Sequence, residues 1–258
     1  MPRSKRVVAV GVPHHITQRG NSRQDVFVND GLRRVYLELL AEHAARNRLS
    51  VLAYCLMTNH LHLVVLPELE RSMANTFRHA HSRFAQYWNT EFSRSGHLWQ
   101  NRFSSCPVEE FAAWRVIRYV EQNPVRAGMA PTAESWPWSS APAHLGLEAR
   151  PLLDCRWWNQ RWTAETWAAV LGEADSEAAP IRLATYGGRP YGSDAFVRAL
   201  ETQLDRRLER RKGGRPSQRP TQPENLDEGP PEASPRQGEN RKASIDTSCH
   251  RFHQSRSE

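Results

Sequence analysis

The spacing of apolar side chains along the first 150 residues predicts alternating strands and helices. Period-two alternation or short apolar runs indicate strands, and apolar positions three to four residues apart indicate helices. The strand-like runs cover residues 12–20, 50–57, 60–67 and 104–109. The helical stripes cover residues 31–48, 72–88 and 111–122. Thr58 and Asn59 form the short turn of a hairpin between the second and third strands. The resulting order is β-α-β-β-α-β-α.

This order predicts an α+β fold of the ferredoxin-like split βαβ type. The sheet is expected to be antiparallel, with its first and third strands in the centre and helices packed on one face. The opposite face is expected to be open to a ligand. The third strand, residues 60–67, therefore lies in the middle of the sheet.

The remainder of the chain divides by composition. Residues 151–190 carry helical patterns rich in tryptophan, which predict an extension docked on the main domain. A further amphipathic helix begins at Ser193 or Asp194 and is expected to end at Gly213. From residue 213 onward, proline, glycine, serine and charge dominate, which predicts disorder. The predicted organisation is a main domain over 1–150, a helical extension over 151–212 and a disordered tail over 213–258.

Charge and cysteine content narrow the class of protein. The net charge is +7 and comes almost entirely from arginine, whose planar fork binds phosphate in a bidentate manner. A polyanionic partner is expected, and a basic surface that only keeps the chain soluble is the alternative. The four cysteines form no C-x-x-C pair, so neither a zinc ribbon nor a disulfide framework is indicated. No apolar run is long enough to cross a membrane, and we expect a cytoplasmic protein.

The third strand contains two histidines in the stretch "TNHLHLVV". Alternation puts His60 and His62 on one face of the strand, where two imidazoles can bind a metal ion. The last helix adds Tyr119 and Asn123, which lie four residues apart on one face. Asn123 could offer its carbonyl oxygen to a cation, and Tyr119 a phenol. Packed histidines and a half-buried tyrosine are the alternative interpretation.

Seven short stretches of the sequence, taken in their order along the chain, resemble motifs of the HUH single-strand transposases, and most closely of the REP-associated tyrosine transposases. The resemblance covers about residues 7 to 216. The matching stretches are "HHITQRGNSRQDVF", "LMTNHLHLVV", "GHLWQNRF", "YVEQNPVRAGMA", "WPWSSAPAHL", "GRPYGSDAFVRALE" and "RKGGRP".

The resemblance implies metal-dependent cleavage and rejoining of single-stranded DNA by residues 1–150. Tyr119 takes the place of the nucleophile, His60 and His62 those of the metal ligands, and Asn123 that of a third ligand, where relatives often have glutamine. The implied ion is Mg²⁺ or Mn²⁺. Attack by Tyr119 would give a 5′-phosphotyrosine and a free 3′-hydroxyl, so that strands rejoin without ATP. The implied substrate is a REP-type DNA hairpin, bound by a monomer, with a homodimer as the alternative.

Basic side chains that could contact the DNA backbone occur in three regions of the sequence. They lie in the N-terminal arm and first strand, around the last core helix, and at the end of the C-terminal helix. The expected nucleic-acid-binding residues are Arg3, Lys5, Arg6, His15, Arg19, Arg23, Arg102, Arg126, Arg206, Arg207, Arg210, Arg211, Lys212 and Arg215. Solvated surface charges, and a polar core position for His15, are the alternatives.

Rival functions make different demands on the sequence. A non-catalytic single-stranded nucleic-acid-binding module on the same fold needs exposed aromatic residues on the central strands, where this chain has histidines. A two-histidine phosphoesterase needs H-x-T or H-x-S twice in the folded domain, and residues 1–150 contain only one copy, at residues 15–17. A zinc deaminase needs P-C-x-x-C, which is missing. A zinc hydrolase with a third histidine or cysteine ligand is left open.

Overall fold

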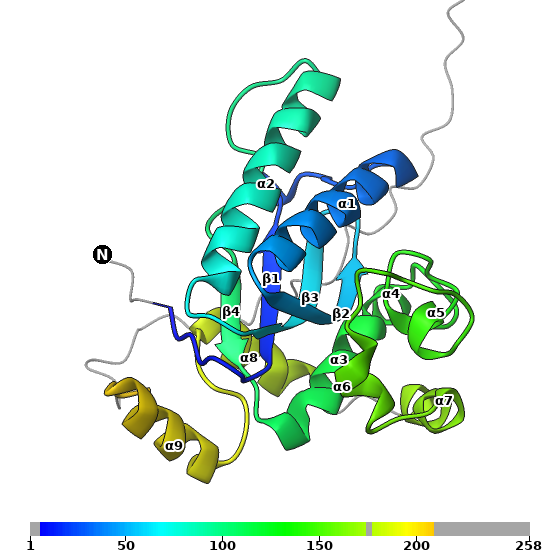
Figure 1. Cartoon of the computed structure of the whole chain (residues 1–258). Coiled ribbons are helices and arrows are strands. Elements are labelled where there is room, and N and C mark those ends of the chain that lie inside the picture. The colour runs from blue at the N-terminus through cyan, green and yellow to red at the C-terminus, as the bar shows by residue number, and fades with distance from the viewer. Residues whose placement is uncertain (1–5, 174–176, 209–258) are drawn as a thin grey trace, which may run out of the picture. The chain divides into compact units, whose positions relative to one another are not determined.

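The computed structural model describes residues 6–173 and 177–208, and within them a four-stranded antiparallel sheet (Figure 1). The strands are β1 (His14–Arg19), β2 (Leu49–Leu56), β3 (His60–Pro67) and β4 (Ser104–Pro107). Their order across the sheet is β2-β3-β1-β4, so β1 and β3 lie in the centre. The predicted α+β fold with central first and third strands is confirmed.

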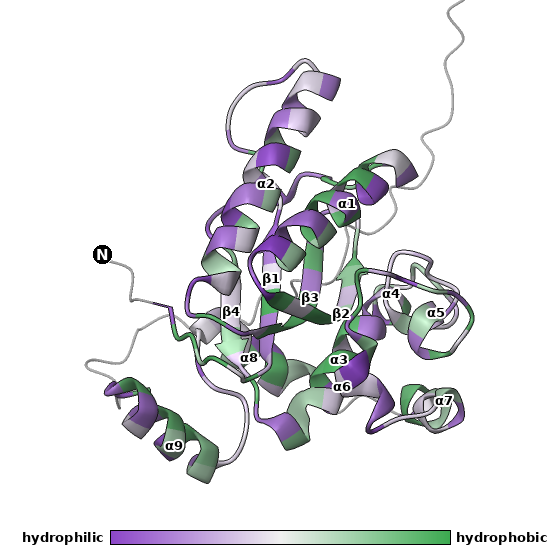
Figure 2. Cartoon of the chain, viewed as in Figure 1, coloured by the Kyte–Doolittle hydropathy of each residue, from purple (hydrophilic) through white to green (hydrophobic). Residues whose placement is uncertain are grey.

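Two long helices cover one face of the sheet. They are α1 (Asp30–Arg46) and α2 (Ser72–Glu91), which pack against each other and against β2 (Figure 1). The side chain of Asn29 caps α1 by accepting a hydrogen bond from the backbone N–H of Leu32. The apolar residues of the central strands on this face, Ile16, Leu61 and Leu63, pack into the first hydrophobic core. In Figure 2, α2 is largely hydrophilic along its length.

The opposite face of the sheet, which we expected to be open, is covered. Helix α3 (Ala113–Glu121) packs on β2 and β3, and α8 (Ala178–Gly187) packs on β4 and β1. Figure 1 shows α8 behind the sheet, on the side away from α1 and α2. The apolar side chains of Cys55, Val64 and Cys106 on this face belong to a second buried core, shared with α3 and the extension. The expectation of an open face was wrong because burying these side chains is favourable, and the extension supplies the cover.

Short helices follow α3 along the chain. Helices α4 (Asn123–Arg126) and α5 (Ala141–His144) lie within residues 1–150. The extension consists of α6 (Cys155–Asn159), α7 (Ala164–Gly172), α8 and α9 (Asp194–Leu204). Trp158 and Trp167 are buried in the second core, as expected for tryptophans that anchor the extension. Helix α9 ends at Leu204 and not at Gly213, because Asp205 adopts a left-handed conformation that closes the helix.

Two expectations concern residues that the structure does not describe in full. The predicted disordered tail, residues 213–258, lies outside the described residues. So do six of the expected DNA-binding residues, Arg3, Lys5, Arg210, Arg211, Lys212 and Arg215. Over the part of the chain that is described, no helix is both long and apolar enough to cross a bilayer.

Candidate active site

The two histidines of β3 point to the face covered by α3 and α8. The register pairs His60 with Arg19 and His62 with Thr17 of β1, so both lie over the centre of the sheet. Their ring centroids are 5.1 Å apart and the rings are nearly perpendicular. His60 is 5% exposed and His62 is 2% exposed. The predicted pairing of two imidazoles on one face is therefore present, in a buried setting.

Helix α3 brings Tyr119 to these histidines. Val116, Ile117 and Val120 pack into the second core and fix the rotation of the helix. The ring centroid of Tyr119 then lies 5.6 Å from that of His62, in an edge-on arrangement. Tyr119 itself is only 1% exposed. A residue of the last core helix and a residue of a central strand therefore meet on this face of the sheet.

Arg126 contacts the ring and the backbone of Tyr119, and it also contacts Asn123. The guanidinium carbon of Arg126 lies 4.3 Å from the centroid of the Tyr119 ring. Arg126 also donates hydrogen bonds to the carbonyl oxygen of Tyr119, at 2.8 Å, and to Oδ1 of Asn123, at 2.6 Å. The Asn123 amide donates to the carbonyl of Val120 at 3.3 Å. These bonds fix the amide of Asn123 at the end of α3, and its role as a metal ligand stays a prediction.

His15 of β1 lies on the same face and is bonded to His62. Nε2 of His15 is 3.0 Å from Nδ1 of His62, and Nδ1 of His15 is 2.7 Å from Oγ1 of Thr185 in α8. His15 is 1% exposed. In this structure it is bonded to two other side chains and shielded from solvent, and its contact with DNA stays a prediction. Thr185, 170 residues away in the chain, had no signal in the sequence that could connect it to this site.

The hydrogen bonds of His60 indicate which of its nitrogens is protonated. Nδ1 of His60 lies 2.6 Å from Oδ1 of Asn59, and the amide nitrogen of Asn59 donates to the carbonyl of Arg23. Because Oδ1 can only accept, Nδ1 of His60 is the donor and Nε2 carries the lone pair. This is the tautomer that a metal ligand bound through Nε2 requires.

The donor set fits a metal ion with an incomplete protein shell. His60 and His62 provide two imidazole ligands on one face. Among the described residues there is no group of three or more histidine, cysteine, aspartate or glutamate side chains that could hold an ion. The remaining ligands would therefore come from an amide, water or the substrate phosphate, which are the oxygen donors that Mg²⁺ and Mn²⁺ accept.

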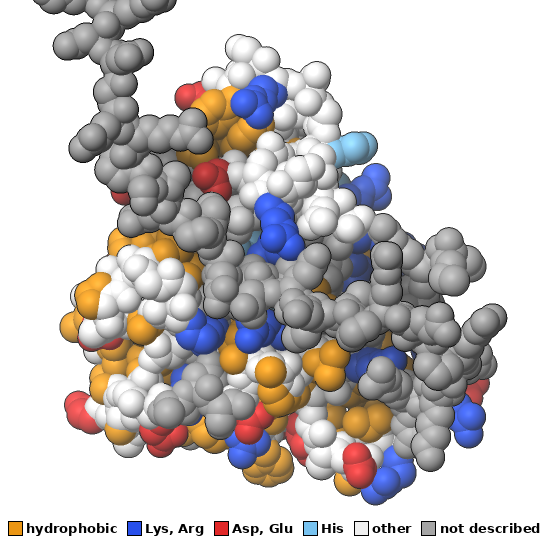
Figure 3. Space-filling view, turned by 180° about the vertical axis from the view of Figure 1, so that it is seen from behind, with side chains coloured by type: hydrophobic (Ala, Val, Ile, Leu, Met, Phe, Trp, Pro, Cys, Tyr) orange, Lys and Arg blue, Asp and Glu red, His pale blue; other side chains and the backbone are white. Residues whose placement is uncertain are grey.

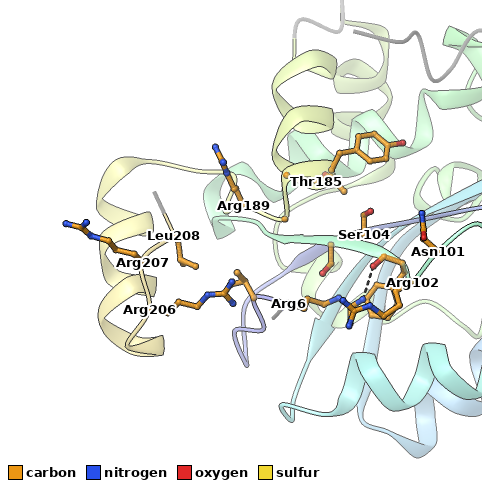
Figure 4. A pocket seen from close by; sticks show the side chains of 15 residues that line it. Arg6, Asn101, Arg102, Ser104, Thr185, Arg189, Arg206, Arg207 and Leu208 are labelled. Atoms are coloured by element: carbon orange, nitrogen blue, oxygen red, sulfur yellow. Dashed lines mark hydrogen bonds between the residues drawn. The ribbon is translucent and has the colours of Figure 1, made fainter. Parts of the chain in front are cut away.

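A basic groove of about 520 Å³ lies beside this site, along β4 (Figure 4). Its lining brings together residues that are far apart in the sequence and includes no aspartate or glutamate. The arginines of the lining are Arg6, Arg102, Arg189, Arg206 and Arg207. In Figure 4, Arg206 points toward Arg6 across the groove, while Arg207 points away. Four of the five are among the residues that we expect to bind nucleic acid, and Arg189 is a further arginine of the lining that the sequence did not single out.

The basic groove is connected to the histidines through Thr185, which lines the groove and hydrogen-bonds to His15. On its other wall, Arg6 donates to the carbonyl of Phe103 at 2.8 Å and stacks 3.5 Å from the Phe103 ring centroid. Burial, with a smaller contribution from the charge of Arg102, lowers the pKa of Arg6 to about 10. Arg6 is still charged at neutral pH.

A smaller hollow of about 260 Å³ continues from the basic groove toward β1. It shares Arg102, Ser104 and Tyr186 with the groove and adds Thr17 and Arg19. Thr17 pairs with His62 across the sheet, so this hollow approaches the histidines from the solvent side. Figure 3 shows Lys and Arg side chains scattered over the face of the molecule seen from behind, several of them near its middle.

The covered face of the sheet thus brings together two histidines of a central strand and a tyrosine of the last core helix. Residues 10–123, which include the sheet, His60, His62 and Tyr119, match the family described as "Transposase IS200 like". No curated protein matches the chain.

Two solved structures are similar to part of the chain. A REP-associated tyrosine transposase bound to a REP hairpin is 18% identical, with a TM-score of 0.49, over 58% of this chain and 89% of that chain. A transposase candidate from Deinococcus radiodurans R1 is 19% identical, with a TM-score of 0.33, over 47% of this chain and 97% of that chain.

Proposed function

We propose that the chain cleaves and rejoins single-stranded DNA through a covalent bond to Tyr119, with REP-type hairpins as the substrate. The observation that carries this proposal is the 5.6 Å distance between the ring centroids of Tyr119 and His62, residues of different elements that meet on one face of the sheet. The family match of residues 10–123 supports a transposase activity in general.

Tyr119 would act as the nucleophile. Its phenol oxygen forms a bond to the phosphorus of a DNA phosphodiester while the bond to the 3′ oxygen breaks. The 3′ oxygen leaves as a hydroxyl, and the phosphate stays on Tyr119 as a 5′-phosphotyrosine. The reverse attack by a 3′-hydroxyl rejoins a strand without an external energy source, since the number of phosphoester bonds is unchanged.

His60 and His62 would hold a divalent ion, Mg²⁺ or Mn²⁺, through Nε2, with Asn123 as the third protein ligand. When bound, the ion neutralises the negative charge that builds on the phosphate in the transition state. Arg126 places a second cation against the Tyr119 ring. A cation in a site shielded from water stabilises developing negative charge more strongly than it does in solvent.

The basic groove would hold the DNA backbone on its way to Tyr119. Arg6, Arg102 and Arg206 line the groove, and Arg19 lines the adjoining hollow. Arginine side chains bind phosphate oxygens without reading sequence, so this contact positions the strand. Arg23 and the basic residues outside the described part of the chain extend the same proposal on sequence grounds.

Access to the site requires movement. Tyr119, His60 and His62 are each at most 5% exposed, so a phosphate reaches them only after the cover of this face opens. We expect DNA binding in the basic groove to favour that opening, because α8 contributes both to the groove and to the cover.

The test is incubation with single-stranded hairpin oligonucleotides and Mn²⁺, followed by denaturing electrophoresis for a covalent adduct. The wild-type chain should form the adduct, and Tyr119→Phe should form none. Tyr54→Phe is the matched control, because Tyr54 is buried in the first core and its hydroxyl makes no hydrogen bond among the described residues. An adduct that persists in Tyr119→Phe would point to another nucleophile. Hairpin binding without any adduct would favour the non-catalytic binding module.

A further inference from the structure

A chain of four hydrogen-bonding groups runs from the extension to the candidate metal ligand. Thr185 donates its hydroxyl proton to the carbonyl of Ile181, one turn earlier in α8, at 2.8 Å. Oγ1 of Thr185 lies 2.7 Å from Nδ1 of His15, and Nε2 of His15 lies 3.0 Å from Nδ1 of His62. The three side chains are at most 2% exposed. These hydrogen bonds link a helix of the extension to the centre of the sheet.

The direction of these bonds follows from the number of protons available. A hydroxyl has one proton, and that of Thr185 is used on the Ile181 carbonyl, which can only accept. Oγ1 of Thr185 must then accept from Nδ1–H of His15. A neutral imidazole that donates at Nδ1 accepts at Nε2, so His15 accepts the proton of Nδ1–H of His62. His62 is left with its lone pair on Nε2.

The other contact of Thr185 agrees with this direction. Sγ of Cys106 lies 3.4 Å from Oγ1 of Thr185. Burial raises the pKa of the Cys106 thiol to about 12, so the sulfur keeps its proton at neutral pH. Oγ1 of Thr185 has two lone pairs, one for His15 and one for the thiol of Cys106.

We propose that Thr185 is a positioning residue that sets the tautomer of His62 through His15, so that Nε2 of His62 is ready to bind the ion. The effect on metal binding and strand cleavage rests on the proposed function, but the positions of the protons are a property of the protein alone. It assigns a role in the active site to the extension. Outer groups that orient a metal-bound histidine change metal affinity or activity by about 10- to 100-fold when they are removed.

Thr185→Val is the decisive variant, since it keeps the shape of the side chain and removes the oxygen. Without the oxygen of Thr185, Nδ1–H of His15 loses the acceptor that lies 2.7 Å away in the wild-type chain. His15 is then expected to carry its proton on Nε2 and donate to His62, which moves the proton of His62 to Nε2. Thr185→Ser keeps the oxygen and should keep the wild-type arrangement.

A matched control is available on the other face of the sheet. Thr76 is also buried, and its hydroxyl donates to a backbone carbonyl, that of His43, at 3.2 Å. Thr76→Val therefore removes a comparable hydrogen bond without touching the histidine chain. Equal thermal midpoints for Thr76→Val and Thr185→Val would show that both variants fold.

The primary measurement is long-range proton–nitrogen NMR of the histidine rings in metal-free protein, at about pH 8, well above the ordinary imidazole pKa of about 6.5. The His62→Asn variant assigns the signals of His62. We expect Nδ1–H for His62 in wild type, Thr185→Ser and Thr76→Val, and Nε2–H in Thr185→Val. A wild-type His62 protonated on Nε2, or a tautomer that does not change in Thr185→Val, overturns the inference.

A second measurement connects the tautomer to the ion and to DNA. Mn²⁺ affinity, measured by calorimetry, should fall at least about 10-fold in Thr185→Val and be unchanged in Thr76→Val. The rate of adduct formation should fall by a similar factor, while affinity for the hairpin is unchanged. If no variant forms an adduct, the proposed function fails, but the NMR result still decides the role of Thr185.

Discussion

Glu121 holds helix α3 in place through a buried carboxylate, and replacing it tests how much that carboxylate contributes. Its Oε1 accepts hydrogen bonds from Oγ of Ser140 at 2.5 Å and Nδ1 of His144 at 2.6 Å. Its Oε2 accepts from Nε1 of Trp167 at 2.8 Å. Glu121 is fully buried and lies two residues after Tyr119. The network therefore ties the helix of the candidate nucleophile to α5 and α7.

The magnitude for Glu121→Gln follows from the bonds that an amide can replace. The amide oxygen of Gln can accept from Ser140 and His144, but its NH₂ group then faces the indole N–H of Trp167, and two donors cannot pair. The variant loses one hydrogen bond to a charged group and leaves a buried donor unsatisfied, and each of these costs about 1–3 kcal/mol. We expect a loss of about 3 kcal/mol in the free energy of unfolding. In the opposite orientation of the amide, its NH₂ group faces Ser140 and His144, so two hydrogen bonds are lost and the cost is no smaller.

The assay is equilibrium unfolding in urea, followed by tryptophan fluorescence and circular dichroism. With a slope of about 2–3 kcal/mol/M, the midpoint should fall by about 1 M while the slope stays constant. Glu134→Gln is the control, because Glu134 is exposed, and its midpoint should match wild type. A loss below about 1 kcal/mol in Glu121→Gln would refute the description of Glu121 as an essential acceptor.

Two further predictions use groups outside this network. Burial lowers the pKa of His14 from 6.5 to about 4. Between these two pH values the unfolded chain therefore binds a proton that the native chain does not. The free energy of unfolding should fall by about 3 kcal/mol as the pH drops from about 6.5 to about 4. Urea unfolding at several pH values checks this, and His14→Gln should flatten the profile, whereas an unchanged profile would contradict it. Arg102→Ala, in the basic groove, should reduce the slope of log affinity for single-stranded DNA against log salt by about one. Arg34→Ala, on the exposed side of α1, is the control, and equal slopes for both variants would place the DNA elsewhere.

The sequence alone determined the order of elements and the face of β3 that carries His60 and His62. Side-chain periodicity is a local property: alternate residues of a strand share a face, and residues four apart share a helix face. The same rule connected Tyr119 with Asn123. Composition also sets residues 213–258 apart from the rest of the sequence, and their disorder stays a prediction.

Only the tertiary structure decided what surrounds these side chains. The cover of the second face by α8, the bond of His15 to Thr185 and the bond of Trp167 to Glu121 depend on residues of the extension, and Glu121 also pairs with Ser140 and His144. These partners are 19 to 170 residues apart in the chain, and no periodicity links positions so distant. The packing of the extension on the sheet brings them together, because the apolar side chains of that face must be buried. The same packing buries the candidate active site, with His60, His62 and Tyr119, among these apolar side chains.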